Sequence, residues 1–128
     1  MQSKANQHLK QALVKSGFHA VPEDLHEASL DLNSFLVKSP ASTYFFRVGG
    51  GEMESHGIYD GDILILDRAR EVVGQGLVVI ADEDSFKVRS IHKDGDSIHI
   101  YDGANRRVRI ESLHQIWGVA TAVIRKMV

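Results

Sequence analysis

The sequence predicts a mostly β protein with one short helix near its N-terminal end and a polar arm before that helix. Two observations support this expectation. From residue 43 onward, short apolar runs alternate with turn residues, and the first sixteen residues contain few apolar side chains. Short strands separated by glycine, aspartate and asparagine are typical of compact antiparallel β folds. We therefore expect a flexible arm over residues 1–16 and a single β domain over residues 17–128.

Seven runs rich in β-branched and aromatic residues are expected to form the strands. Among the turn signals between them, Asp94-Gly95 is the strongest, because this pair tolerates the positive φ angles of a type I′ hairpin turn. Asp60-Gly61-Asp62 predicts a tight turn that leads into a buried strand. The expected strands are Tyr44–Val48, Ile63–Leu66, Leu77–Ile80, Phe86–Ile91, Ser97–Tyr101, Arg107–Ile110 and Trp117–Ile124.

Upstream of the strands, residues 31–38 are expected to form a short helix. Asp31 falls in its first turn and Lys38 near its last, and Pro40 ends the element. Residues 17–28 are expected to be irregular. The arm over residues 1–16 buries little apolar area, whereas ordering a residue costs about 1–2 kcal/mol, so we expect the arm to be mobile.

The composition excludes several kinds of chemistry. The chain has 128 residues, a net charge of −2 and no cysteine. The absence of cysteine rules out disulfides, thiolate metal sites and a cysteine nucleophile. The seven histidines lack ligand spacing, and Gly49-Gly50-Gly51 is followed by Glu52 and Met53, where a phosphate-binding loop needs a lysine. We expect a cytoplasmic protein without metal, cofactor, membrane contact or sequence-specific DNA binding.

One segment carries a more specific pattern. Gly50-Gly51-Glu52-Met53 is followed by Gly57-Ile58-Tyr59-Asp60-Gly61-Asp62 and an apolar strand that ends at Asp67. This segment resembles the core motif of the LexA/UmuD family, in which Gly-Asp-Ser-Met precedes Gly-Ile-x-Asp-Gly-Asp. The resemblance implies a compact LexA/UmuD-type, signal-peptidase-like β-fold. Further matching segments are Gly76–Ala81, Phe86–Arg89 and Gly118–Ala120, and, with UmuD in particular, Leu13–Phe18, Asp31–Leu36 and Pro40–Phe45.

The resemblance also implies an activity. UmuD-type proteins are dimers that cut their own N-terminal arm when a RecA–DNA filament stimulates them. The trimmed form joins a Y-family polymerase, UmuC, in error-prone translesion synthesis. The cut uses a Ser–Lys dyad, in which the lysine is the base and the serine is the nucleophile. In this chain, the scissile pair is expected at Ser16-Gly17.

This sequence departs from the family at both positions of the dyad. Glu52 stands at the nucleophile position and Arg89 at the position of the general base. A carboxylate is a poor nucleophile toward a peptide, and a guanidinium is always protonated. We therefore expect no catalytic residues, a vestigial cleavage site, and a partly buried ion pair between Glu52 and Arg89.

The sequence favours a UmuD-like accessory protein of the SOS response and translesion synthesis, with an inactive peptidase site. Its expected partners are a UmuC-like polymerase, a RecA filament or another UmuD-like chain. Two alternatives stay open. One is an active self-cleaving serine peptidase that uses a shifted dyad of Ser55 and Lys87. The other is a phage or plasmid decoy of RecA or of a repressor.

The closing run over residues 117–124 is apolar and uncharged. On an exposed sheet edge, such a run would promote association, and family members use this region in their two-fold contacts. We therefore expect a homodimer, or a heterodimer with another UmuD-like chain, that pairs or packs through residues 117–126. The expected contacts are Trp117, Val119, Thr121 and Val123.

Overall fold

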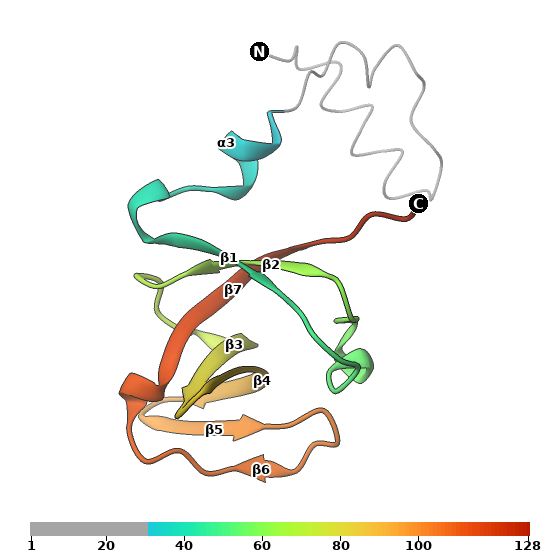
Figure 1. Ribbon diagram of the computed structural model, residues 1–128. Coiled ribbons are helices and arrows are strands. Elements are labelled where there is room, and N and C mark those ends of the chain that lie inside the picture. Colours follow the sequence, from blue (N-terminus) through green and yellow to red (C-terminus); the bar gives the residue numbers. More distant parts are fainter. Residues whose placement is uncertain (1–30) are drawn as a thin grey trace, which may run out of the picture. The chain divides into compact units, whose positions relative to one another are not determined.

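The computed structural model describes residues 31–128 (Figure 1). The chain divides into two units after Phe35, and the sheet belongs entirely to the second. The expected arm over residues 1–16, the pair Ser16-Gly17 and the expected irregular segment over residues 17–28 lie outside the described residues. Within the described part, no helix is long and apolar enough to cross a bilayer.

The expected helix is present as α3, Leu32–Leu36, and is shorter than the sequence indicated. Asp31 begins it: its carboxylate accepts hydrogen bonds from the backbone N–H groups of Asn33 and Ser34, at 3.1 and 3.3 Å. The helix ends before Lys38 because Ser39, which precedes Pro40, is extended, with φ −133° and ψ 89°.

All seven expected strands are present in one sheet, and the fold is therefore mostly β, as predicted. The strand order is β1-β2-β7-β3-β4-β5-β6 and every neighbouring pair is antiparallel. Short 3₁₀ turns, which the sequence did not indicate, precede β1 and β7 and follow β1. The strands are β1 Thr43–Arg47, β2 Ile63–Asp67, β3 Gly74–Asp82, β4 Ser85–Asp94, β5 Ser97–Tyr101, β6 Arg107–Val108 and β7 Ile116–Ile124.

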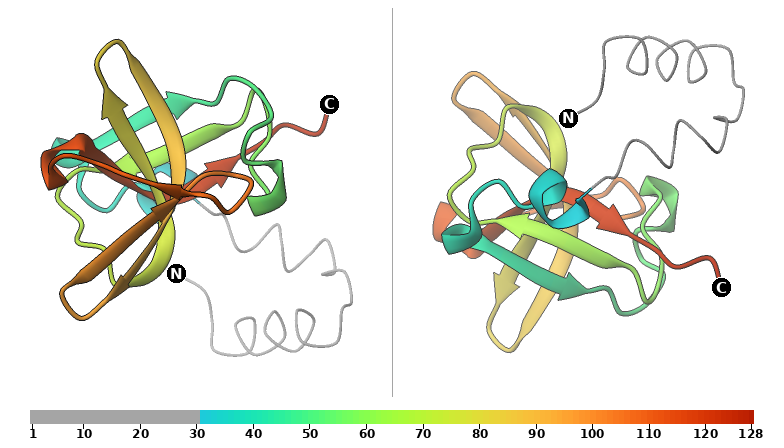
Figure 2. Two further views of the ribbon diagram at one scale, coloured as in Figure 1. Left: turned by 90° about the horizontal axis from the view of Figure 1, so that it is seen from below. Right: turned by 90° about the horizontal axis from the view of Figure 1, so that it is seen from above.

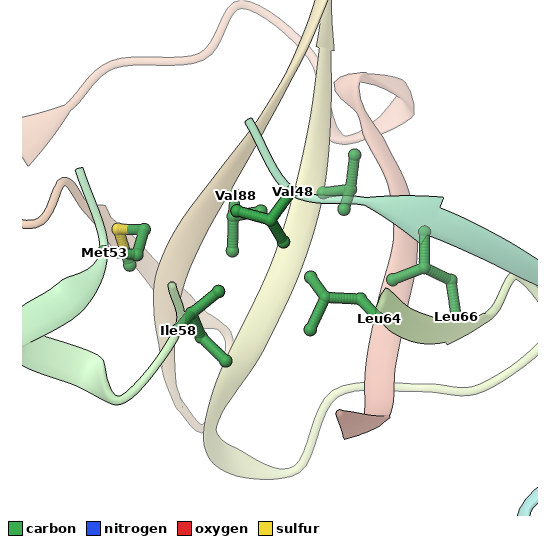
Figure 3. Close-up of a cluster of buried hydrophobic side chains, with 7 residues drawn as sticks. Val48, Met53, Ile58, Leu64, Leu66 and Val88 are labelled. Atoms are coloured by element: carbon green, nitrogen blue, oxygen red, sulfur yellow. The ribbon is translucent and has the colours of Figure 1, made fainter. Parts of the chain in front are cut away.

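The core consists of two apolar clusters, and β3 contributes to both of them. Consecutive residues of a strand point to opposite faces, so Val79 joins one cluster and Val78 the other. Figure 3 shows the first cluster, in which side chains from the turn after β1 meet side chains of β2 and β4. Its buried members are Val48, Met53, Ile58, Leu64, Leu66, Val79 and Val88, and those of the second are Val78, Ile80, Ile91 and Ile100.

Strand β7 is an interior strand over part of its length, so only part of the run over residues 117–124 can act as an exposed edge. It lies between β2 and β3 in the sheet (Figure 1). An apolar run looks alike in an edge strand and in a central strand, so the sequence did not separate the two. However, the last residue of β7 that pairs with β3 is Val119, whereas pairing with β2 continues to Ile124. One side of residues 120–124 therefore has no neighbouring strand within the described part of the chain.

The β4–β5 hairpin differs by one residue from the expected turn. Asp94 pairs with Ser97, so the two loop residues are Gly95 and Asp96. Gly95 has φ 60°, and the one non-glycine residue among residues 31–128 with a positive φ is Asn105. A positive φ at the first loop residue alone fits a type II′ turn rather than the predicted type I′.

A buried carboxylate joins the turn before β2 to the end of β7. Asp62 is only 1% exposed. Arg125, just after β7, donates from Nε and Nη2 to its two oxygens, each at 2.7 Å. Arg125 also donates to the Gly57 carbonyl at 2.8 Å, and its guanidinium stacks 4.4 Å from the centre of the Tyr59 ring. These contacts hold the turn Gly57–Asp62 against the C-terminal end of the sheet.

The Asp62–Arg125 contact predicts a specific sensitivity to acid. The hydrogen bonds from Arg125, with the Tyr59 N–H, lower the pKa of Asp62 from 3.8 to about 2. A carboxylate with a lowered folded-state pKa stabilises the fold above its unfolded pKa and loses that contribution as the pH falls through the folded pKa. We expect Asp62→Asn to lower the melting temperature at pH 7 and to flatten its decline between about pH 4 and pH 2.

Thermal unfolding followed by circular dichroism across this pH range tests the expectation. Asp96→Asn is the matched control, because Asp96 lies in the exposed β4–β5 turn. It should keep the wild-type slope. An equally steep acid decline in Asp62→Asn would contradict the assignment.

Candidate functional site

The segment after β1 brings Glu52 over β4. Its start is fixed to the turn before β2: Val48 N donates to the Asp62 carbonyl and Gly61 N to the Val48 carbonyl, both at 2.8 Å. Gly50 adopts φ 84°, in the left-handed region that favours glycine, and its N–H donates to the Asp60 carboxylate at 2.7 Å. Met53 is then 3% exposed in the first core cluster. Its burial anchors the neighbouring Glu52.

Arg89 approaches from β4 and contacts Glu52 directly. Its Nη1 lies 3.0 Å from Oε2 of Glu52, and the same nitrogen donates to the Val88 carbonyl at 2.7 Å. The predicted ion pair is therefore confirmed. Its burial is uneven: the Arg89 side chain is 11% exposed and the Glu52 side chain is 67% exposed. Water therefore reaches the carboxylate while the guanidinium is largely buried.

The loop between β5 and β6 closes one side of this pair. At Gly103, a Cβ atom would lie 1.6 Å from the carbonyl oxygen of Glu52, so only glycine fits there. Ser55 Oγ donates to the Gly103 carbonyl at 2.8 Å. Asp102 stabilises the loop by accepting hydrogen bonds from Arg106 N and Arg106 Nε. Asp102-Gly103 reads as a turn in the sequence, but no local signal indicates its contact with Glu52.

A cleft of about 220 Å³ opens beside the ion pair. Its walls combine apolar side chains with polar groups, and Glu52, Lys87 and Arg89 supply its charges. Phe86 is 51% exposed and makes edge contacts with Phe46 and Trp117, at centroid distances of 6.4 and 5.7 Å. Such a cleft suits an extended chain segment that carries both apolar and polar groups. It is lined by Phe46, Val48, Gly49, Gly50, Glu52, Met53, Ser85, Phe86, Lys87, Val88 and Arg89.

The two residues of the alternative dyad do not bond to each other in the described part of the chain. Ser55 donates its hydroxyl to Gly103 and lies 3.1 Å from His56 Nδ1. Lys87 is exposed on β4, opposite Ile80, and lines the cleft wall. Within residues 31–128, no group of three or more acidic or histidine side chains is arranged to hold a metal ion.

The residues expected at a dimer interface differ in their accessibility. Trp117 packs edge-on against Tyr44 at 5.0 Å and lies under the guanidinium of Arg68, 4.4 Å from the ring centre. Val119 packs against the second core cluster, and Thr121 Oγ1 donates to the Ile65 carbonyl at 3.2 Å. Val123 is 44% exposed. The surface available on β7 is therefore near its C-terminal end.

The exposure of Glu52 sets the expected cost of removing it. We expect Glu52→Ala to lower the free energy of unfolding by about 1 kcal/mol, because solvent screens a largely exposed carboxylate. Loss of a partner from a fully buried pair costs about 3–5 kcal/mol. Urea unfolding measures the free energy of unfolding of the variant and of the wild type. Glu83→Ala is the control, because Glu83 is exposed and lies outside the described ion pairs. If Glu52→Ala loses no more unfolding free energy than this control, the contact is not formed in solution.

Comparison with known proteins places the chain in a family. Residues 9–120 match the family described as Peptidase S24-like. Protein SamA of Salmonella typhimurium is 35% identical over 113 residues, which cover 87% of this chain and 79% of SamA. Protein MucA of Escherichia coli is 30% identical over 119 residues, covering 84% of this chain and 77% of MucA. The LexA repressor of Glaesserella parasuis is 34% identical over 92 residues, 68% of this chain and 44% of the repressor. The chain therefore belongs to the Peptidase S24-like family, as a UmuD-like member of the LexA/UmuD group that its motifs resemble.

Proposed function

We propose that this protein is a UmuD-like accessory factor of SOS mutagenesis whose peptidase site is inactive. The observation that carries the proposal is the 3.0 Å contact between Arg89 and Glu52 at the two positions where the family has its base and its nucleophile. Peptide cleavage by a Ser–Lys dyad needs a neutral amine that takes the serine proton. A guanidinium is always protonated and cannot take it.

The geometry also weighs against a shifted dyad of Ser55 and Lys87. A nucleophile and its base must come within hydrogen-bond reach of each other. The Ser55 hydroxyl instead donates to the Gly103 carbonyl, in the loop that closes the site. Self-cleavage through these residues would require the hydroxyl to leave this contact, so we favour the inactive site.

With catalysis lost, the chain works as a binding module. Its sheet, its buried Met53 and its cleft with exposed Phe86 are those of a scaffold that still presents a binding surface. The partners we propose are a UmuC-like polymerase, a RecA filament or another UmuD-like chain. The UmuD-like relatives support this choice of partners.

Incubation with activated RecA filaments tests the inactive site. We expect the wild-type chain to stay intact, because neither Glu52 nor Arg89 can perform the dyad chemistry. Mass spectrometry would detect a product that begins at Gly17. Glu52→Ser combined with Arg89→Lys restores the dyad residues and should yield this product if the scaffold is competent, while either single change should not.

Cleavage of the wild-type chain between Ser16 and Gly17 would overturn the proposal. Ser55→Ala and Lys87→Ala then separate the remaining explanations, because the shifted dyad requires both side chains. Loss of cleavage in each variant would identify that dyad.

We also propose that the chain dimerises through the C-terminal half of β7. Residues 120–124 pair with β2 on one side and have no strand on the other within the described part of the chain. Val123 and Ile124 are 44% and 40% exposed there. A free, apolar strand edge favours pairing with a second chain, and a two-fold axis would satisfy both edges at once.

Sedimentation equilibrium tests the dimer. We expect a dimer at micromolar concentration, and we expect Val123→Lys to weaken it at least tenfold, because two-fold pairing places like charges near each other. Val73→Lys is the control, since Val73 is 86% exposed in the loop between β2 and β3. A wild-type monomer at micromolar concentration would contradict the proposal.

A further inference from the structure

The strand β6 ends the sheet on the side opposite to β1 and offers a free edge. It pairs with β5 through Val108, opposite Ile100, and Arg107, opposite Tyr101. Within residues 31–128, no strand lies on its outer side (Figure 2). Unpaired N–H and C=O groups on such an edge are ready to pair with another chain.

A groove of about 440 Å³, lined by four apolar side chains and two arginines, lies along this edge. The arginines are Arg107 and Arg109. The apolar side chains, each either buried in the second core cluster or packed against it, are those of Ile98, Ile100, Val108 and Ile110. Continued β5–β6 pairing would bring Ile110 opposite Ile98, but β6 ends at Val108. The groove therefore stays open where the strands stop pairing.

Arginines alternate with the apolar residues along the edge. The segment reads Arg107-Val108-Arg109-Ile110, in which both arginines are exposed and both apolar side chains are half-buried. The apolar side chains therefore lie toward the core, whereas the arginines reach solvent and also line the groove.

No carboxylate of the described residues forms an ion pair with these arginines. Of the three ion pairs formed within residues 31–128, none includes Arg107 or Arg109. Arg107 contacts the ring nitrogen Nδ1 of His99, and the Asp102 carboxylate is bonded to Arg106 instead. Glu111 lines a neighbouring pocket together with Arg109 without forming an ion pair. The edge thus combines a groove with four apolar side chains and two arginines that form no ion pair within residues 31–128.

We propose that the β6 edge and its groove bind an extended segment of a partner protein in which acidic and apolar residues alternate. In an added strand, directly opposed side chains share a face. Apolar residues of the partner would lie beside Val108 and Ile110 over the groove. Its carboxylates would lie beside Arg107 and Arg109. Backbone hydrogen bonds to β6 provide affinity, and the alternation provides specificity.

Charge and shape argue against two other occupants. A second copy that paired its own β6 edge here would place the arginines of both chains on neighbouring strands, where like charges are destabilising. Single-stranded nucleic acid usually stacks its bases on aromatic side chains, and none of the residues that line this groove is aromatic. The groove shares no lining residue with the cleft beside Glu52, so the inference is independent of the proposed function.

Fluorescence anisotropy with the full-length chain tests the proposal. The probe is a fluorescein-labelled octapeptide that alternates glutamate with valine and isoleucine. One control peptide has lysine in place of glutamate, and another has the same composition with its four glutamates in one block. We expect binding of the alternating acidic peptide alone. Arg109→Glu should weaken it at least tenfold, whereas Arg70→Glu, an exposed arginine in the loop between β2 and β3, should change it less than twofold.

Amide hydrogen exchange then locates the bound peptide. Protection that appears within residues 107–110 supports strand addition at β6. Three outcomes would overturn the proposal: equal affinity for the block peptide, unchanged affinity in Arg109→Glu, or protection at Met53 and Phe86 in place of the β6 edge. Tighter binding of an oligothymidylate, competing with the peptide and lost in Arg109→Glu, would assign the edge to nucleic acid instead.

Discussion

The buried carboxylate of Asp62 is the constraint on which the arrangement of the site depends. Burying a charge is costly unless it is paired and hydrogen-bonded, and Asp62 meets this requirement through Arg125 and the Tyr59 N–H. Asp62 also accepts Val48 N through its own carbonyl, which fixes the end of β1. The turn positioned in this way carries Met53 into the core, and Met53 places Glu52 over Arg89. Arg125, which follows the last strand, therefore supports the contact between Glu52 and Arg89 through its bonds to Asp62.

The fold and the chemistry of the site rest on different residues. The first core cluster is formed by apolar side chains such as Met53, Ile58 and Leu64, and it includes neither Glu52 nor Arg89. A scaffold that brings positions 52 and 89 into contact does so whichever residues occupy them. Glutamate and arginine satisfy that contact by a charged hydrogen bond. Catalysis can therefore be lost at these two positions while the sheet and the cleft persist.

The sequence predicted the strands well because their signals are local. Short runs of apolar and β-branched residues, with turn residues between them, mark each of the seven strands, and the family motif brought Glu52 and Arg89 together. Relations between distant segments were missed. The partner of Asp62 is 63 residues away along the chain, and no local pattern links the two. The interior position of β7 and the type II′ turn at Gly95 depend on strand order and on a one-residue register, and neither is encoded in a local apolar pattern.

The uneven burial of the Glu52–Arg89 pair also limits how the cleft can hold a chain segment. The Glu52 side chain is 67% exposed, so it presents negative charge to the cleft, and Lys87 adds positive charge on its wall. If the site is inactive, as proposed, a segment bound there leaves by dissociation rather than by cleavage. Under the proposed function, the lifetime of such a complex is then set by the apolar contacts of Phe46 and Phe86 and by the fit of the segment's charges. In the proposed accessory role, Glu52 and Arg89 would therefore favour retention of a bound segment over its cleavage.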